Sequence, residues 1–239
     1  MFIWSKDTIC WLEEAASYTN YYNQLAAYIE PYLKPYFNVC EIGCGLGHLA
    51  CAISPNVKSI TAVDINDSAI DKVIEVSQKL NITNITPIVA NWVNWQPQIK
   101  YDIVMLSYFN AVKSNWQELK KLTKRYIIAI LSNGESGSNL ICNQYDPIYE
   151  SEHGRENIFN VTAFLNKNHI KYRLIEQELE FGQPLNDWED AFKYVKHYYL
   201  ATNEEINKYL KTYLIPMNER YYLPKLKKSG IIIIDLENQ

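Results

Sequence analysis

The strongest pattern in the chain is the run Val39-Cys40-Glu41-Ile42-Gly43-Cys44-Gly45-Leu46-Gly47-His48-Leu49-Ala50. Apolar residues lead into three glycines at alternate positions, and a helix-like segment follows them. Because glycine has no Cβ, a strand that ends in glycines and opens into a helix can bring bare backbone close to a ligand. The start of such a helix also offers unpaired N–H groups to an anionic or polar group. The run therefore predicts a strand–turn–helix unit that holds a ligand at its turn.

A carboxylate follows the next apolar run. Asp64 comes directly after residues 60–63, one strand–helix unit beyond the glycines. At the end of a second strand, a carboxylate can accept hydrogen bonds from both hydroxyls of a ribose. Together, the glycine turn and this acid indicate a cofactor that contains adenosine. A glycine-rich turn without any ligand is the alternative explanation.

The spacing of the glycines separates two classes of adenosine cofactor. The dinucleotide fingerprint is G-x-G-x-x-G, whereas here the third glycine, Gly47, comes one residue early and His48 takes the dinucleotide position. The pattern Glu-x-Gly-x-Gly-x-Gly, which starts at Glu41, resembles the first motif of the class I S-adenosylmethionine-dependent methyltransferases, and Asp64 matches the acid of their second strand. The resemblance covers residues 20–131 well and the remainder weakly. An NAD-dependent oxidoreductase is the competing class.

The resemblance implies an α/β fold with a Rossmann-like, doubly wound sheet of seven mostly parallel strands and an antiparallel final strand. Apolar runs predict strands at 38–42, 59–63, 86–89, 101–106, 126–131, 172–179 and 231–234. Helical spacing of apolar residues predicts helices at 7–33, 46–53, 67–81, 116–124 and 157–169. Residues 221–223 are a candidate to pair beside the last strand.

We expect a single domain over residues 1–239, because no linker or break in composition divides the chain. Within it we expect an N-terminal helical cap (1–36), a cofactor-binding core (37–131), a substrate loop (132–156) and a helical insertion before the last strand (184–216). The insertion either walls a substrate pocket or forms the surface of a homodimer.

The resemblance assigns cofactor contacts to the glycine motif, to the carboxyl ends of the strands and to the N-terminal helix. The residues are Glu41, Gly43, Gly45, Gly47, Asp64, Ile65, Asn91, Trp92, Ser107 and Tyr21. Ile65 is expected to pack on an adenine face. Asn91 stands where the family often has Asp, but its amide oxygen can still accept a hydrogen bond from the adenine amino group. The main-chain N–H of Trp92 is expected to meet a ring nitrogen.

Aromatic residues crowd the predicted N-terminal helix, which in the family closes over the methionine end of the cofactor. One of Tyr18, Tyr21 and Tyr22 is expected to contact the carboxylate or the sulfonium of the cofactor. Packing alone explains these side chains equally well, because the chain has 19 tyrosines.

The segment after the fourth predicted strand is Ser107-Tyr108-Phe109-Asn110. Ligands of open α/β sheets bind outside the carboxyl ends of the strands, so this segment is expected to lie between cofactor and acceptor. Enzymes that methylate exocyclic amines of bases carry Asn/Asp-Pro-Pro-aromatic here, and this chain has neither proline. No Pro-Cys pair follows, which also argues against a cysteine nucleophile acting on a pyrimidine.

Methyl transfer from a sulfonium needs a base only when the acceptor keeps its proton near neutral pH. The candidate bases are His48, Tyr108 and His153. His48 lies beside the glycine turn, where a helix cap or plain packing is the competing role. The predicted substrate loop also offers Tyr145, Tyr149 and Arg155, and a solvated loop with incidental polar residues explains them equally well.

Composition argues against several other classes. The net charge is −4 and no long Lys/Arg run occurs, so nucleic acid is not favoured as a partner; a basic patch at 120–125 or 225–228 beside the site would favour it. The five cysteines form no C-x-x-C pair, so we expect reduced thiols and no metal site. The first residues lack an export signal and no apolar run reaches 18 residues, so we expect a cytoplasmic protein without a membrane segment.

The patterns together predict an enzyme that transfers a methyl group from S-adenosylmethionine to a small molecule. The motif pair, the acidic composition and the aromatic helical insertion support this prediction. The alternatives are a methyltransferase acting on RNA or protein, and a module that binds S-adenosylmethionine without catalysis. The residues do not identify the acceptor.

Overall fold

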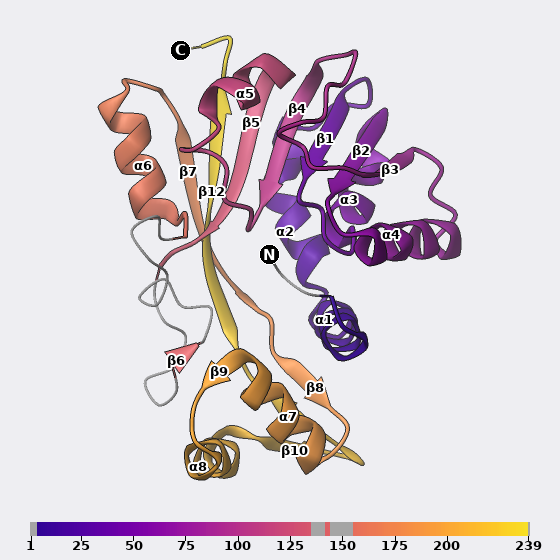
Figure 1. Ribbon diagram of the computed structural model, residues 1–239, viewed down its shortest axis with the longest axis vertical. Coiled ribbons are helices and arrows are strands. Elements are labelled where there is room, and N and C mark those ends of the chain that lie inside the picture. Colours follow the sequence, from indigo (N-terminus) through magenta and orange to yellow (C-terminus); the bar gives the residue numbers. More distant parts are fainter. Residues whose placement is uncertain (1–3, 135–141, 144–154, 239) are drawn as a thin grey trace.

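The computed structural model describes residues 4–134, 142–143 and 155–238. Its centre is a seven-stranded sheet with the strand order β3-β2-β1-β4-β5-β12-β7 (Figure 1). The strands are β1 (Asn38–Ile42), β2 (Ser59–Asp64), β3 (Ile85–Val89), β4 (Tyr101–Ser107), β5 (Thr123–Ser132), β7 (Arg173–Glu180) and β12 (Leu226–Asp235). Neighbours pair in parallel except β12, which runs antiparallel to both β5 and β7. The predicted α/β, doubly wound sheet with an antiparallel last strand is confirmed.

Helices cover both faces of the sheet, as expected for strands that read as nearly continuous apolar runs. On one face lie α2 (Tyr21–Ile29), α3 (His48–Ile53) and α4 (Asp67–Lys79), and on the other lie α5 (Trp116–Leu122) and α6 (Ile158–Lys167). Two 3-10 helices, η1 (Glu30–Tyr32) and η2 (Ser54–Asn56), follow α2 and α3. Successive residues of a strand point to opposite faces, so Ile231 packs under α2 while Ile232 packs under α5 and α6.

The N-terminal segment forms two helices where the sequence predicts one. α1 (Lys6–Thr19) starts with a capping box between Ser5 and Thr8 and ends at Asn20, whose φ of 52° is left-handed. Asparagine tolerates this conformation better than most residues, and it ends the first helix there. The break lets α1 and α2 pack against different parts of the molecule.

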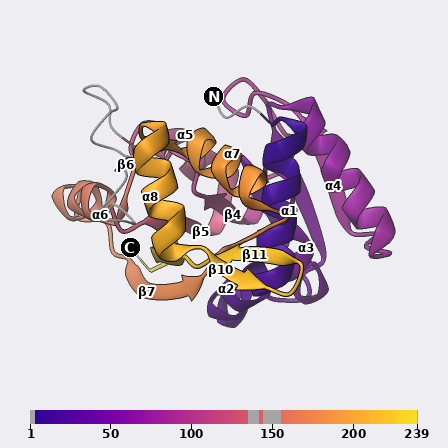
Figure 2. The same ribbon diagram turned by 90° about the horizontal axis from the view of Figure 1, so that it is seen from below.

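The segment between β7 and β12 forms a separate lobe beyond the carboxyl ends of the parallel strands (Figures 1 and 2). The lobe contains β8 (Gln183–Leu185), α7 (Trp188–Tyr198), β9 (Tyr199–Leu200), α8 (Asn203–Tyr213), β10 (Ile215–Met217) and β11 (Arg220–Leu223). β9 pairs with β6 (Cys142–Asn143). The core of the lobe includes Tyr194, Leu210 and Trp11, the last of which comes from α1.

The expected pairing of residues 221–223 beside the last strand is wrong. β11 instead joins β8 and β10 in a three-stranded sheet. The link from β10 to β11 has Asn218 at a φ of 54°, and a positive φ is typical of tight hairpin turns. This hairpin pairs β11 with β10, and Pro224, which has no N–H to donate, separates it from β12.

Candidate functional site

The glycine turn after β1 has the geometry that its composition predicts. Gly43, Gly45 and Gly47 have φ values of 69°, 52° and 73°, all in the left-handed region. A Cβ at Gly43 would overlap the ring of Phe109, and a Cβ at Gly47 would lie 2.8 Å from Val73 of α4. The first glycine therefore lies against an aromatic side chain, and the third lets α3 pack closely on α4.

The N–H groups of the turn are mostly used within the protein, contrary to prediction. The amides of Gly43 and Cys44 donate to the carbonyl of Val63 at 2.8 and 3.1 Å, and that of Gly47 donates to the carbonyl of Cys44 at 3.0 Å. The following helix, α3, has only six residues. The turn bonds back onto the end of β2, so these N–H groups are not available to a ligand, and the rings of Phe109 and Trp4 lie against Gly43 and Gly45.

Asp64 joins the glycine turn to the end of β2. Its Oδ2 accepts a hydrogen bond from the N–H of Gly45 at 2.9 Å, and its Oδ1 accepts one from the N–H of Asn66 at 2.9 Å. An ionised carboxylate has about four acceptor positions, so capacity remains for two hydroxyl donors. The side chain is half-buried and hence reachable. These residues fit the ribose of an adenosine cofactor.

Apolar side chains lie exposed at the carboxyl ends of β2 and β3. Ile65 is 52% exposed and Val89, the last residue of β3, is 53% exposed. Asn91 is exposed, and its Oδ1 accepts a hydrogen bond from the N–H of Val93 at 3.3 Å. The side chain of Trp92 is buried in the core, so only its main chain is available to a ligand. This edge offers an adenine ring two apolar surfaces and an amide.

Glu41 is buried behind the turn rather than presented at its surface. It is 1% exposed, the N–H of Ala50 in α3 donates to its carboxyl, and no described group pairs with its Oε2. Burial raises the pKa of Glu41 to about 8, so the carboxyl is protonated at neutral pH. The hydrogen bond from the N–H of Ala50 to Glu41 connects the start of α3 to β1.

Tyr108 and Tyr21 meet at the carboxyl end of β4. Tyr108 follows Ser107, has a φ of 52°, and places its hydroxyl 2.6 Å from that of Tyr21 and 2.8 Å from Oγ of Ser229. Burial raises the pKa of both phenols. Both therefore stay neutral at physiological pH, and Tyr108 serves as a hydrogen-bond donor more readily than as a base.

The side chain of His48 lines a cavity that is separate from the glycine turn. Its ring stacks on Tyr22 with centroids 5.1 Å apart, and both residues line this cavity of about 740 Å³ between α1, α3 and α4, whose described lining includes neither the turn glycines nor Asp64. Burial, helped by the charge of Lys72, lowers the pKa of His48 to about 4. The imidazole is neutral at pH 7 and a weak base.

Tyr18, the third candidate tyrosine, is 52% exposed, and its hydroxyl donates a hydrogen bond to the sulfur of Met217.

Of the predicted substrate loop, the structure describes residues 132–134, 142–143 and 155–156. His153, Tyr145 and Tyr149 lie outside the described residues, and Arg155 is half-buried. Glu156 was not predicted, yet its buried carboxylate accepts N–H groups of three successive residues at 3.2, 2.8 and 2.7 Å; these are Ala111, Val112 and Lys113. No local pattern signals this contact, because 43 to 45 residues separate the partners.

Three residues around Tyr108 are not among the predicted site residues, although one of them, Lys227, belongs to the basic patch at 225–228. Gln177 of β7 donates from Nε2 to Oγ of Ser229, and the ammonium of Lys227 lies 3.6 Å from the centroid of the Tyr108 ring. A signal was present: positions 227, 229 and 231 alternate along one strand, so they share the face on which Ile231 is buried.

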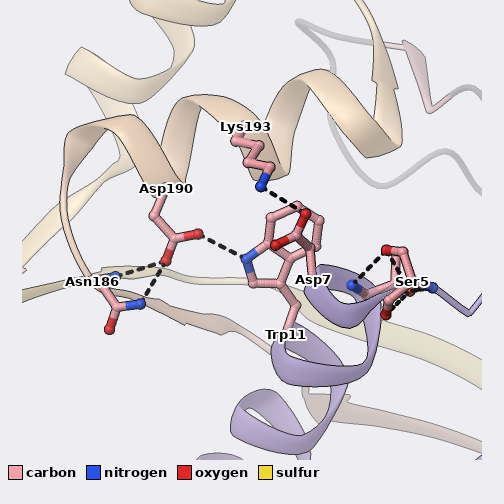
Figure 3. Close-up of polar contacts among 7 residues, drawn as sticks. Ser5, Asp7, Trp11, Asn186, Asp190 and Lys193 are labelled. Atoms are coloured by element: carbon pink, nitrogen blue, oxygen red, sulfur yellow. Dashed lines mark hydrogen bonds and ion pairs between the residues drawn. The ribbon is translucent and has the colours of Figure 1, made fainter.

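The N-terminal helix is bonded to the lobe that faces the site (Figure 3). Nε1 of Trp11 donates to Oδ1 of Asp190 at 2.9 Å, and the ammonium of Lys193 lies 2.6 Å from a carboxylate oxygen of Asp7. Asp190 also accepts the N–H of Asn186 at 2.9 Å. α1 and α7 therefore form one cover over the carboxyl edge of the sheet.

The part of the chain that the structure describes shows no cluster that could hold a metal ion and no helix that could span a membrane. Cys10, Cys40, Cys44 and Cys51 are free thiols, and no cluster of His, Cys, Asp or Glu among these residues could hold a metal ion. None of the described helices combines the length and apolar character needed to cross a membrane.

Comparisons with known proteins agree with this geometry. A family model described as "Methyltransferase domain" matches residues 33–208. No curated protein sequence matches the chain significantly.

Solved structures share the fold at low identity. The YcgJ protein of Bacillus subtilis is 14% identical over 90% of this chain and 98% of its own, with a TM-score of 0.55. Magnesium protoporphyrin IX methyltransferase of Synechocystis PCC 6803, solved with bound SAH, is 10% identical over 96% and 89%, with a TM-score of 0.52. Precorrin-6y C5,15-methyltransferase of Geobacter metallireducens is 10% identical over 88% of each chain, with a TM-score of 0.50.

Proposed function

We propose that this chain, which belongs to the class I S-adenosylmethionine-dependent methyltransferases, methylates a small-molecule acceptor at the carboxyl edge of its sheet. S-adenosylmethionine is the cofactor. When bound, it supplies a methyl group attached to a sulfonium, and the rest of the cofactor is the leaving group, a neutral thioether. The observation that carries the proposal is the pairing of the left-handed glycine turn with Asp64, which retains acceptor capacity for two hydroxyls.

We assign the nucleoside end of the cofactor to the edge formed by β1, β2 and β3. Asp64 would accept the ribose hydroxyls, Ile65 would cover one face of the adenine, and Asn91 would accept from the adenine amino group. The exposure of Ile65 and Asn91 supports this assignment, since neither side chain is committed to the core.

We assign the methionine end to the glycine turn and the end of β4. Ile42, which precedes the turn, pairs with Leu106, which precedes Ser107, and Tyr21 reaches this region through Tyr108. The rings of Phe109 and Trp4 lie over the turn. These aromatic side chains would exclude water from the reacting groups, which is the main contribution that a protein makes to an in-line displacement.

Several features support a small molecule as acceptor. One of the two basic patches that would favour nucleic acid, Lys120, Lys121, Lys124 and Arg125, lies in α5 and at the start of β5, at the amino edge of the sheet. The other lies nearer the site, but the ammonium groups of its Lys225 and Lys227 lie over the rings of Tyr199 and Tyr108 rather than in an open basic stripe. The aromatic lobe faces the carboxyl edge. Two proteins of similar fold act, by their names, on tetrapyrrole-related small molecules.

Transfer of labelled methyl groups tests this proposal. The purified protein is incubated with S-adenosylmethionine, labelled in its methyl group, and with a cell extract that is then separated into small-molecule, RNA and protein fractions. We expect the label in the small-molecule fraction. Label in RNA or protein would contradict the acceptor class, and tight cofactor binding without transfer into any fraction would indicate a non-catalytic module.

A further inference from the structure

A cationic side chain lies in a cage of aromatic rings next to the end of β4. The ammonium of Lys227 is 3.6 Å from the ring centroid of Tyr108, 4.9 Å from that of Phe181 and 5.2 Å from that of Tyr21. A cation at these distances from ring faces is attracted to them. The residue as a whole is half-buried, so part of it is exposed to solvent beside the rings.

The cage provides no anion for this cation. Among the described residues, no carboxylate or other acceptor is bonded to Nζ of Lys227, and its aromatic neighbours Tyr21 and Tyr108 remain neutral because burial raises the pKa of both phenols. The nearby Lys225 adds a second cation, which donates to the hydroxyl of Tyr199 at 3.5 Å. Burial and the charge of Lys225 lower the pKa of Lys227 to about 7. A partly desolvated cation without a counter-charge is costly, and an anionic ligand would relieve that cost.

The position of the cage connects it to the acceptor. Tyr108, the ring closest to Lys227, directly follows Ser107, the last residue of β4. Ligands of sheets of this type bind outside the carboxyl ends of the strands. The hydroxyl of Tyr108 is also fixed by Ser229, which shares the face of β12 with Lys227. The cation thus lies one side chain away from the strand end where cofactor and acceptor are proposed to meet.

We propose that Lys227 is the anion-binding group of the acceptor subsite, and that the methyl acceptor is an organic acid whose carboxylate pairs with this ammonium. The inference rests on the proposed function, because it takes the acceptor to bind beside β4. A carboxylate fits better than a phosphate, since one ammonium walled by three rings balances one charge, whereas a tetrahedral dianion calls for several converging donors.

Binding of matched acids and amides tests the proposal. Benzoate, cinnamate and indole-3-acetate are titrated by calorimetry into the protein saturated with S-adenosylhomocysteine, each beside its amide, with phenylphosphonate as the phosphate-like probe. We expect at least one acid to bind at least tenfold more tightly than its amide. The preference should disappear in Lys227→Met and persist in Lys228→Met, whose residue is exposed and points to the opposite face of the strand.

Several outcomes would overturn the assignment. They are an absence of acid binding to the wild type, an equal affinity for acids and amides, a preference that survives in Lys227→Met, and a stronger affinity for the phosphonate. The affinity for S-adenosylhomocysteine, measured on the same samples, should be unchanged in Lys227→Met. A wild type that fails to bind this nucleoside would contradict the cofactor site instead, so the two failures are distinguishable.

A second measurement does not depend on a variant that folds. Brief treatment with acetic anhydride, followed by peptide mass spectrometry, reports the reactivity of each lysine. We expect the acid that binds best to protect Lys227 from acetylation while the exposed Lys120 reacts as before. Equal labelling of Lys227 with and without the acid would contradict a bound carboxylate at this ammonium.

Discussion

At the scale of single residues, Asp64 carries most of the expected nucleoside recognition. Asp64→Ala should weaken binding of S-adenosylmethionine by about 10- to 100-fold, because the loss of its hydrogen bonds to the ribose costs about 1–3 kcal/mol in total. Calorimetry measures the change, and Asp67→Ala, at an exposed position in the first turn of α4, is the matched control. An unchanged dissociation constant for Asp64→Ala would remove this residue from the site.

Gly43 tests the shape of the turn. Gly43→Ala should destabilise the protein by about 1–2 kcal/mol from its left-handed backbone alone, and further because the new Cβ overlaps the ring of Phe109. Phe109→Ala removes the second cost and leaves the first. Urea unfolding of both single variants and the double variant should therefore give a combined loss smaller than the sum of the single losses. Strictly additive losses would show that the ring does not crowd Gly43.

Glu41 makes stability depend on pH in a defined direction. Its pKa is raised from an ordinary 4.5 to about 8 by burial, so the folded protein binds this proton more tightly than the unfolded chain. The stabilisation that the protonated Glu41 contributes to the free energy of unfolding is complete below pH 4.5 and is lost as the pH rises through about 8. We expect Glu41→Gln to remove this loss, whereas Glu118→Gln, at an exposed position, leaves the profile of unfolding free energy against pH unchanged. Parallel profiles for wild type and Glu41→Gln would refute a protonated Glu41.

At the scale of elements, the contact between α1 and α7 joins the cap to the lobe. Trp11→Phe keeps the ring in the core of the lobe but removes the donor to Asp190. A double-mutant cycle of Trp11→Phe with Asp190→Asn should give a coupling of about 1 kcal/mol in the free energy of unfolding, which is typical of a hydrogen bond within a protein. A coupling of zero would mean that the two helices are held together by packing alone.

The elements of the sheet could be predicted from sequence because each depends on local apolar patterning. The strand at 38–42 lies where the sequence predicts it. The break at Asn20 could not be predicted, because a capping asparagine and an interior one look alike until tertiary packing selects the left-handed conformation. The pairing of β11 with β8 joins residues about 38 positions apart, which no local pattern encodes.

In the candidate site, too, residues joined by a local motif could be predicted and residues joined by long-range contacts could not. The glycine turn, Asp64 and Ile65 are close in sequence, and their motif predicts their common placement. The environment of Tyr108 is assembled from distant segments: Tyr21 is 87 residues away and Ser229 is 121 residues away. Residue types alone could therefore suggest the cofactor side of the site but not the acceptor side.

At the scale of the whole molecule, the carboxyl edge of the sheet faces a cover built from the N-terminal helix and the segment between β7 and β12. α1 from the N-terminus and the lobe inserted before β12 share one apolar core (Figure 2). Aromatic side chains dominate that cover, and the basic residues of α5 and the start of β5 lie at the opposite edge. The basic residues near the carboxyl edge, Lys225 and Lys227, lie over aromatic rings instead of forming an open stripe, which is the large-scale reason to expect a small acceptor.

A crystal structure with bound S-adenosylhomocysteine would locate the cofactor site. We expect both ribose hydroxyls within hydrogen-bond distance of Asp64 and the amino-acid end against Gly43 and Gly45, with the rings of Phe109 and Trp4 shifted to admit it. Electron density for the nucleoside elsewhere, for instance in the cavity of about 740 Å³ lined by His48, with the glycine turn unchanged, would rule out a cofactor site at this turn.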